Sequence, residues 1–195
     1  ENFDANFTFY SRKLGLVTIG GFYKRLNNVF YMQQTILENI PDSTIVAEFP
    51  LETFPSLAQG TTDFYMNSPY QAEIRGLEVE WQSNFSWLPS PFNGIVLNAN
   101  YTHVWSETDY MLHRVLFIVP PGGWLPEPHE SETSYSKPLL HQADDIANVS
   151  LGYDYKGFSA RLSFRFQGNV VSTVRSLPAL NEYTDHEYKF DFVVK

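Results

Sequence analysis

The sequence predicts an all-β protein built as an antiparallel meander of long strands. Two observations carry this prediction: apolar and polar residues alternate in several segments, and short and long connections alternate between those segments. A strand places successive side chains on opposite faces, so this alternation gives each strand one apolar and one polar face. Because apolar and polar residues cancel in the average of such strands, the alternation explains how a chain with 16% aromatic residues has a mean hydropathy of only -0.27.

The clearest pair of strands flanks residues 156–157. From Phe158 to Gln167, Phe, Ala and Leu alternate with Ser, Arg and Gln, and the segment from Ala147 to Tyr155 alternates in the same way. Lys156 and Gly157 lie between the two segments, and glycine readily adopts the positive φ that a two-residue hairpin turn needs. The sequence therefore predicts a tight hairpin here.

Seven strands are expected in all. They lie near residues 2–11, 15–33, 69–87, 94–109, 144–155, 158–173 and 184–195. Short turns are expected at 12–14, 88–94 and 156–157, and longer loops at 34–68, 110–143 and 174–183. Each strand reverses the direction of the chain, so the short turns should share one end of the sheet and the long loops the other.

Strand length and loop pattern point to a membrane barrel. Several expected strands exceed ten residues, whereas a tilted membrane strand needs roughly 9–11 and soluble strands usually have about 5–6. Short turns at one end and long loops at the other are typical of outer-membrane barrels, in which apolar faces meet lipid and polar faces line the lumen. A soluble β-sandwich would also alternate, so that fold remains the alternative.

Composition excludes several function classes. The net charge of -9 argues against nucleic-acid binding, which needs a basic surface, and the absence of cysteine excludes disulfides and thiolate chemistry. No apolar run is long enough for a membrane helix; the longest, at 115–119, ends at Pro120. No catalytic or phosphate-binding motif occurs, and we interpret His129 beside Glu130 as solvated loop. We expect no enzymatic activity, metal site or cofactor.

Four segments resemble the barrel of TonB-dependent outer-membrane receptors. The segment Arg75–Trp81 resembles a strand that follows a long outer loop and descends to a periplasmic turn, and Gly94–Thr102 resembles the next, ascending strand. The segments Ala147–Tyr153 and Gly157–Ser163 are similar to the following hairpin. Phe22–Lys24, followed by Asn27 and Asn28, resembles an earlier strand that climbs to an outer loop. These segments occur in the family's order and cover most of the expected strands, but none of the long loops.

The resemblance implies that residues 1–195 are a single segment of a TonB-dependent transporter barrel, the C-terminal part, within a larger chain. The family's barrel has 22 strands and lies in the outer membrane of Gram-negative bacteria. Its function is TonB-dependent uptake of a scarce nutrient such as a siderophore, cobalamin, an oligosaccharide or a peptide. The implied partners are membrane lipid, the nutrient, a surface lipoprotein, and TonB acting through a plug domain that this segment lacks.

Two other functions remain open from the sequence. A passive porin-like barrel needs similar strands but no plug domain. A soluble β-sandwich that binds carbohydrate through aromatic loops also fits the alternation. The presence of a plug domain elsewhere in the full polypeptide would separate the transporter from the porin.

Family members bind cargo at the outer loops and the lumen surface near them. The candidate cargo-stacking residues in that region are Trp105, Tyr110, Trp124 and Tyr135. These aromatic residues could equally pack the loops together. The polar residues expected to line the lumen are Glu78, Glu80, Asn98, Asn100, Arg161 and Arg165. We expect the charged residues among them to lie close together and to form mainly cross-strand ion pairs.

Overall fold

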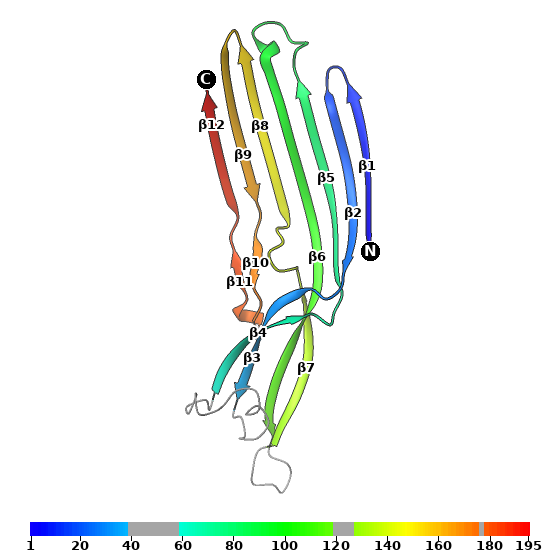
Figure 1. Ribbon diagram of the computed structural model, residues 1–195, viewed down its shortest axis with the longest axis vertical. Coiled ribbons are helices and arrows are strands. Elements are labelled where there is room, and N and C mark those ends of the chain that lie inside the picture. The colour runs from blue at the N-terminus through cyan, green and yellow to red at the C-terminus, as the bar shows by residue number, and fades with distance from the viewer. Residues whose placement is uncertain (39–58, 119–126, 176–177) are drawn as a thin grey trace.

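The main feature of the computed structural model is one antiparallel sheet (Figure 1). The structure describes residues 1–38, 59–118, 127–175 and 178–195. The wall of the sheet consists of β1 (Asn2–Ser11), β2 (Gly15–Leu26), β5 (Ala72–Asn84), β6 (Ile95–Ile118), β8 (Asp145–Tyr155), β9 (Phe158–Gln167) and β12 (Glu187–Val194). Each strand pairs antiparallel with the next one in this order. The predicted all-β meander is confirmed.

The register assigns every wall residue to one of two faces. Phe164 pairs with Val149 on one side and Phe190 on the other, so all three side chains share a face. This apolar face also carries Phe3, Phe7, Phe9, Ile19, Leu77, Val79, Tyr101, Leu151, Leu162, Tyr188 and Phe192. The opposite, polar face carries Asn6, Thr8, Thr18, Glu78, Glu80, Asn98, Asn100, Thr102, Asn148, Ser150, Ser163, Arg165 and Lys189.

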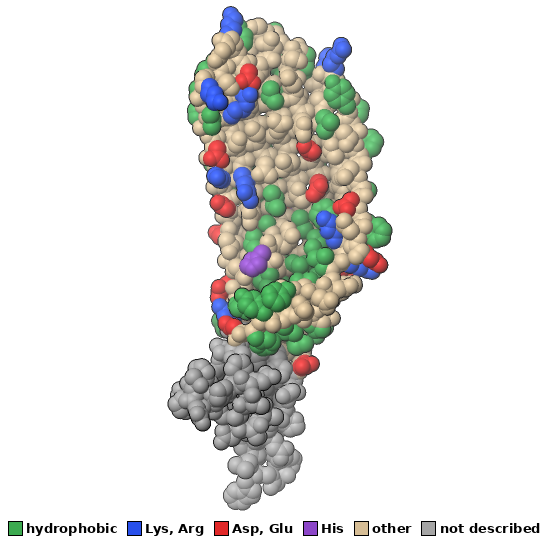
Figure 2. Space-filling view, viewed as in Figure 1, with side chains coloured by type: hydrophobic (Ala, Val, Ile, Leu, Met, Phe, Trp, Pro, Cys, Tyr) green, Lys and Arg blue, Asp and Glu red, His purple; other side chains and the backbone are tan. Residues whose placement is uncertain are grey.

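The wall is a single layer, and its apolar face is uncovered. Phe7 is 71% exposed and Phe190 is 69% exposed, and no second sheet packs on the wall within the described residues. Figure 2 looks onto the polar face, where charged side chains are scattered over polar atoms. Strands β1 and β12 form the two edges of the described wall, so a closed barrel is not seen.

The three short turns lie together at one end of the wall (Figure 1). Lys156 and Gly157 have φ values of 49° and 87° and form the predicted tight hairpin. The indole N–H of Trp87, in the turn after β5, donates to the carbonyl of Lys13, in the turn between β1 and β2, at 2.9 Å. The expected separation of short turns from long connections is therefore confirmed for the described residues.

The long connections differ from the expectation, because they contain strands. β3 (Phe30–Glu38) and β4 (Gln59–Asn67) form a hairpin, and β6 continues to Ile118 and pairs with β7 (Glu127–Lys137). A short β10 (Val170–Thr173) pairs with β11 (Glu182–Thr184). The prediction of irregular loops at 34–68 and 110–143 is therefore wrong in part. β6 has no glycine or proline along its length, so nothing local ends it at the expected position.

The packed core lies at the loop end and not in the wall. Tyr31, Tyr110, Val171 and Val174 are buried together there. The rings of Tyr31 and Tyr110 meet edge to face, with centroids 5.3 Å apart and planes at 85°. This cluster joins β3 and β6 to the chain around β10, which holds the loop hairpins against the end of the wall.

We expect Gly15→Ala to destabilise the wall more than Gly157→Ala. Both glycines have positive φ, 77° and 87°, which costs an alanine about 1–2 kcal/mol at each position. A Cβ at Gly15 would also lie 2.1 Å from the carbonyl oxygen of Gln82, whereas a Cβ at Gly157 would meet no atom within 4 Å. Chemical unfolding of both variants measures the difference, and equal losses would contradict the packing at Gly15.

Candidate functional site

Two of the four candidate cargo-stacking aromatics are engaged in packing. Tyr110 is 1% exposed; its hydroxyl donates to the carbonyl of Pro138 at 3.1 Å and accepts from the amide of Leu140 at 3.0 Å. Burial raises the pKa of Tyr110 to about 12. The hydroxyl of Tyr135 donates to the carbonyl of Arg175 at 3.1 Å. These contacts favour the packing role that the sequence left open.

The other two candidates are Trp105 and Trp124. Trp124 lies outside the described residues. Trp105 is 44% exposed, but its register places it on the apolar face together with Tyr101. Trp105 therefore points away from the polar surface that was expected to carry cargo. Its parity with Tyr101 on the same strand follows from the sequence, and the grouping with the outer loops overlooks that parity.

The six expected lumen residues all lie on the polar face, as their register shows: Glu78, Glu80, Asn98, Asn100, Arg161 and Arg165. Neutral amides occupy the middle of the face, where the side-chain amide of Asn148 donates to Asn100 at 2.9 Å. Such cross-strand hydrogen bonds partly satisfy the polar groups of the wall without an added ligand.

The two arginines do not lie beside the two glutamates, and this part of the expectation is wrong. Strands β6 and β8 separate β5, which carries Glu78, from β9, which carries Arg161. Arg161 instead binds Asp154, with Nη2 2.5 Å from Oδ2 and Nη1 3.1 Å from Oδ1. A Cβ on Gly152, the residue opposite Arg161, would lie 2.9 Å from its Nε, so the glycine leaves room for the guanidinium group.

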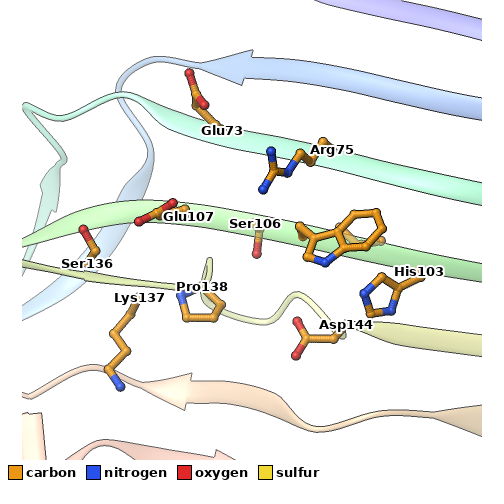
Figure 3. A pocket seen from close by; sticks show the side chains of 11 residues that line it. Glu73, Arg75, His103, Ser106, Glu107, Ser136, Lys137, Pro138 and Asp144 are labelled. Atoms are coloured by element: carbon orange, nitrogen blue, oxygen red, sulfur yellow. The ribbon is translucent and has the colours of Figure 1, made fainter.

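A pocket opens where β6 changes its partner. β6 pairs with β8 as far as His103, which pairs with Asp145, and pairs with β7 from Thr108. Residues 138–144 fill the gap, and the amide of Val104 donates to the carbonyl of Asp144 at 2.8 Å. We call the cavity beside this gap, about 540 Å³ in volume, the strand-switch pocket (Figure 3). Its lining residues are Glu73, Arg75, His103, Val104, Trp105, Ser106, Glu107, Ser136, Lys137, Pro138 and Asp144.

Hydrogen bonds fix part of the pocket's lining. The Nδ1 atom of His103 is 2.7 Å from Oδ1 of Asp145. The ring of His103 packs edge to face against the indole of Trp105, with ring centroids 4.3 Å apart. Glu73 accepts from the hydroxyl of Tyr23 at 2.8 Å and from Nε of Arg25 at 3.2 Å. His103 on the same strand therefore holds Trp105 in place, and Tyr23 and Arg25 on the adjacent strand β2 hold Glu73.

Other lining groups keep bonding capacity. Within the described residues, Glu107 and Asp144 have no ion pair or side-chain hydrogen bond, and the guanidinium group of Arg75 acts on Glu73 only through its charge, which adds to the hydrogen bond from Tyr23 in lowering the pKa of that carboxyl. Burial raises the pKa of Asp144, and the neighbouring carboxylate of Asp145 adds to the effect. The pocket thus presents one guanidinium donor and two carboxyl acceptors beside an exposed indole.

Comparison with known proteins gives no relative. No protein-family model, curated protein or solved structure matches this chain. Over the described ranges, no helix has the length and apolar character to cross a membrane. The same residues contain no group of three or more acidic or histidine side chains placed to hold a metal ion. The two faces of the wall therefore carry the functional inference.

Proposed function

We propose that this chain forms part of a transmembrane β-barrel in the outer membrane of a Gram-negative bacterium. The observation that carries the proposal is the continuous, exposed apolar face of a single-layer sheet. A monomeric soluble protein rarely exposes so large an apolar surface, whereas hydrocarbon covers such a face without a second protein layer. Wall strands of 8–13 residues beside the longer β6 match the roughly 9–11 residues that a tilted membrane strand needs.

The opposite face has the character of a lumen. It carries amides, hydroxyls and charged groups that bond to one another across strands, such as Arg161 to Asp154 and Asn148 to Asn100. Membrane barrels keep such groups on the inside, away from lipid. In hydrocarbon every backbone group must be paired, so the free edges of β1 and β12 would require neighbouring strands. A barrel wider than the described wall meets that requirement.

The transport function rests on the sequence resemblance. The segments similar to TonB-dependent receptors fall on β2, β5, β6, β8 and β9, which are neighbours in this order in the sheet. We propose that the barrel takes up a scarce nutrient, with energy delivered by TonB through a plug domain. Cargo would then pass along the polar face, and a surface lipoprotein would assist at the loop end.

The test is nutrient uptake with and without TonB. Bacteria carrying the gene would be given isotope-labelled probes: a ferric siderophore, cobalamin, an oligosaccharide and a peptide. Uptake of one probe should collapse when the gene is deleted, when TonB is deleted, or when the proton-motive force is dissipated. Uptake that depends on the gene but not on TonB would identify a passive porin. Recovery of the protein in the soluble fraction would contradict the membrane location.

A further inference from the structure

The strand-switch pocket lies where the apolar band of the lipid-facing side ends. Leu77 and Tyr101 are its last members on β5 and β6. Beyond them, towards the loop end, the same face continues with Glu73, Arg75, His103, Trp105 and Glu107. In the proposed membrane orientation, the change from apolar to charged side chains marks the level of the outer headgroups. These five lining residues therefore face the lipid headgroup layer, while Val104 and Ser106, which also line the pocket, have the parity of the polar face.

One wall of the pocket offers a fixed aromatic surface. Trp105 remains 44% exposed while His103 packs against it, and Asp145 holds His103 in place. A held, exposed indole loses little conformational freedom when a ligand packs on it. Ring ligands with a C–H face, such as sugars, bury apolar area on this kind of surface while their hydroxyls remain free to form hydrogen bonds.

The other walls offer both donors and acceptors. Figure 3 shows Arg75, Ser106, Glu107 and Asp144 around one hollow, while Lys137 extends away from it. A hydroxyl group both donates and accepts, so it can use the guanidinium as well as the carboxyl groups. The pocket is lined by three carboxyl groups, those of Glu73, Glu107 and Asp144, and by two cationic side chains, those of Arg75 and Lys137. This excess of carboxyl groups disfavours an anionic ligand. The lining therefore suits a neutral polyhydroxylated ring.

We propose that the strand-switch pocket binds the neutral sugar headgroup of a membrane glycolipid. Its volume of about 540 Å³ is ample for a single sugar ring and lies within the range of roughly 300–1,000 Å³ typical of small-molecule sites. The acyl chains of the lipid would run along the apolar band below Leu77 and Tyr101. The choice of a lipid over a free sugar rests on the proposed membrane location; the recognition of a sugar ring does not.

The test measures two probes on the full chain in detergent micelles. Methyl β-glucoside binding would be followed by saturation-transfer NMR, and retention of glucosyl-diacylglycerol against phosphatidylcholine by native mass spectrometry. Trp105→Ala and Glu107→Gln should each weaken both interactions about tenfold or more, the usual effect of losing a well-placed contact with a ligand. The matched controls are Trp87→Ala at the turn end and Glu78→Gln on the polar face, which should leave binding unchanged.

Each outcome decides the proposal. Equal effects of Glu107→Gln and Glu78→Gln, or no binding of either probe, would overturn it. Tighter binding of glucose 6-phosphate than of methyl β-glucoside would overturn the assignment to a neutral sugar. Binding of the free glucoside without selective retention of the glycolipid would support the sugar site and overturn its lipid source. Failure of the chain to float with phospholipid vesicles would contradict the membrane proposal separately, because the glucoside measurement does not depend on vesicles.

Discussion

Leu162→Arg should cost the folded wall roughly 2–4 kcal/mol, the penalty for a cation at the centre of the lipid-facing side of a barrel. Leu162 lies on the apolar face of β9, 45% exposed, between Leu151 on β8 and Phe192 on β12. In the membrane, the new guanidinium group would be held in hydrocarbon. Urea titration of the chain folded in phospholipid vesicles measures the loss.

The matched control is Ser163→Arg, one residue further along the same strand. Ser163 lies on the polar face opposite Asp191, so an arginine there gains a partner and stays in water; we expect a change within about 0.5 kcal/mol. Arg161→Gln, also on the polar face, should cost much less than Leu162→Arg, because an exposed ion pair contributes little to stability. Similar penalties for Leu162→Arg and Ser163→Arg would contradict the assignment of the two faces.

Tyr110→Ala should cost about 3–5 kcal/mol at the loop end, because it empties the centre of the buried cluster. Tyr110→Phe separates the ring from its hydroxyl. That change keeps the packing with Tyr31 but leaves the amide of Leu140 without its acceptor, at a cost of about 1–3 kcal/mol. Hydrogen exchange of the β3 and β6 amides would report both losses. Unchanged protection in the alanine variant would show that the cluster does not hold the loop hairpins.

Tyr110 should also make the stability of the loop end depend on pH in the alkaline range. Burial raises the pKa of Tyr110 from 10.0 to about 12, so folding favours the neutral phenol. The stability that this provides is fully present below pH 10 and is lost as the pH rises through about 12. Tyr110→Phe should remove this part of the alkaline loss. If the phenylalanine variant loses protection with the same pH profile as the unmodified chain, another group is responsible.

The wall could be predicted from the sequence because strand faces depend only on local alternation. The period-two pattern from Phe158 to Gln167 defined both faces of β9, and Lys156-Gly157 defined the hairpin. The hairpins at the loop end were missed for the opposite reason. β6 continues past the wall, and whether it finds a partner there depends on β7, a separate segment that the alternation within β6 does not specify.

In the candidate site, too, the features set by local alternation were predictable and those set by strand pairing were not. Parity alone placed Glu78, Asn100 and Arg161 on one polar face. It could not tell how far Arg161 lies from Glu78, because that distance depends on the order in which the strands pair. The partner of Arg161, Asp154, lies on the other arm of the predicted hairpin and is within its reach. The strand-switch pocket was not predictable either, since it arises where β6 leaves β8 for β7.

The central claim is that the apolar face of the wall meets lipid and the polar face meets water. The chain contains no cysteine, so single cysteines at positions 162, 163, 190 and 191 can each carry a unique spin label in phospholipid bilayers. Collision rates with molecular oxygen, which concentrates in hydrocarbon, and with a water-soluble nickel chelate then report the surroundings of each label. We predict high oxygen and low nickel accessibility at 162 and 190, and the reverse at 163 and 191. Loss of this alternation, or high nickel accessibility at 162 and 190, would contradict a transmembrane wall.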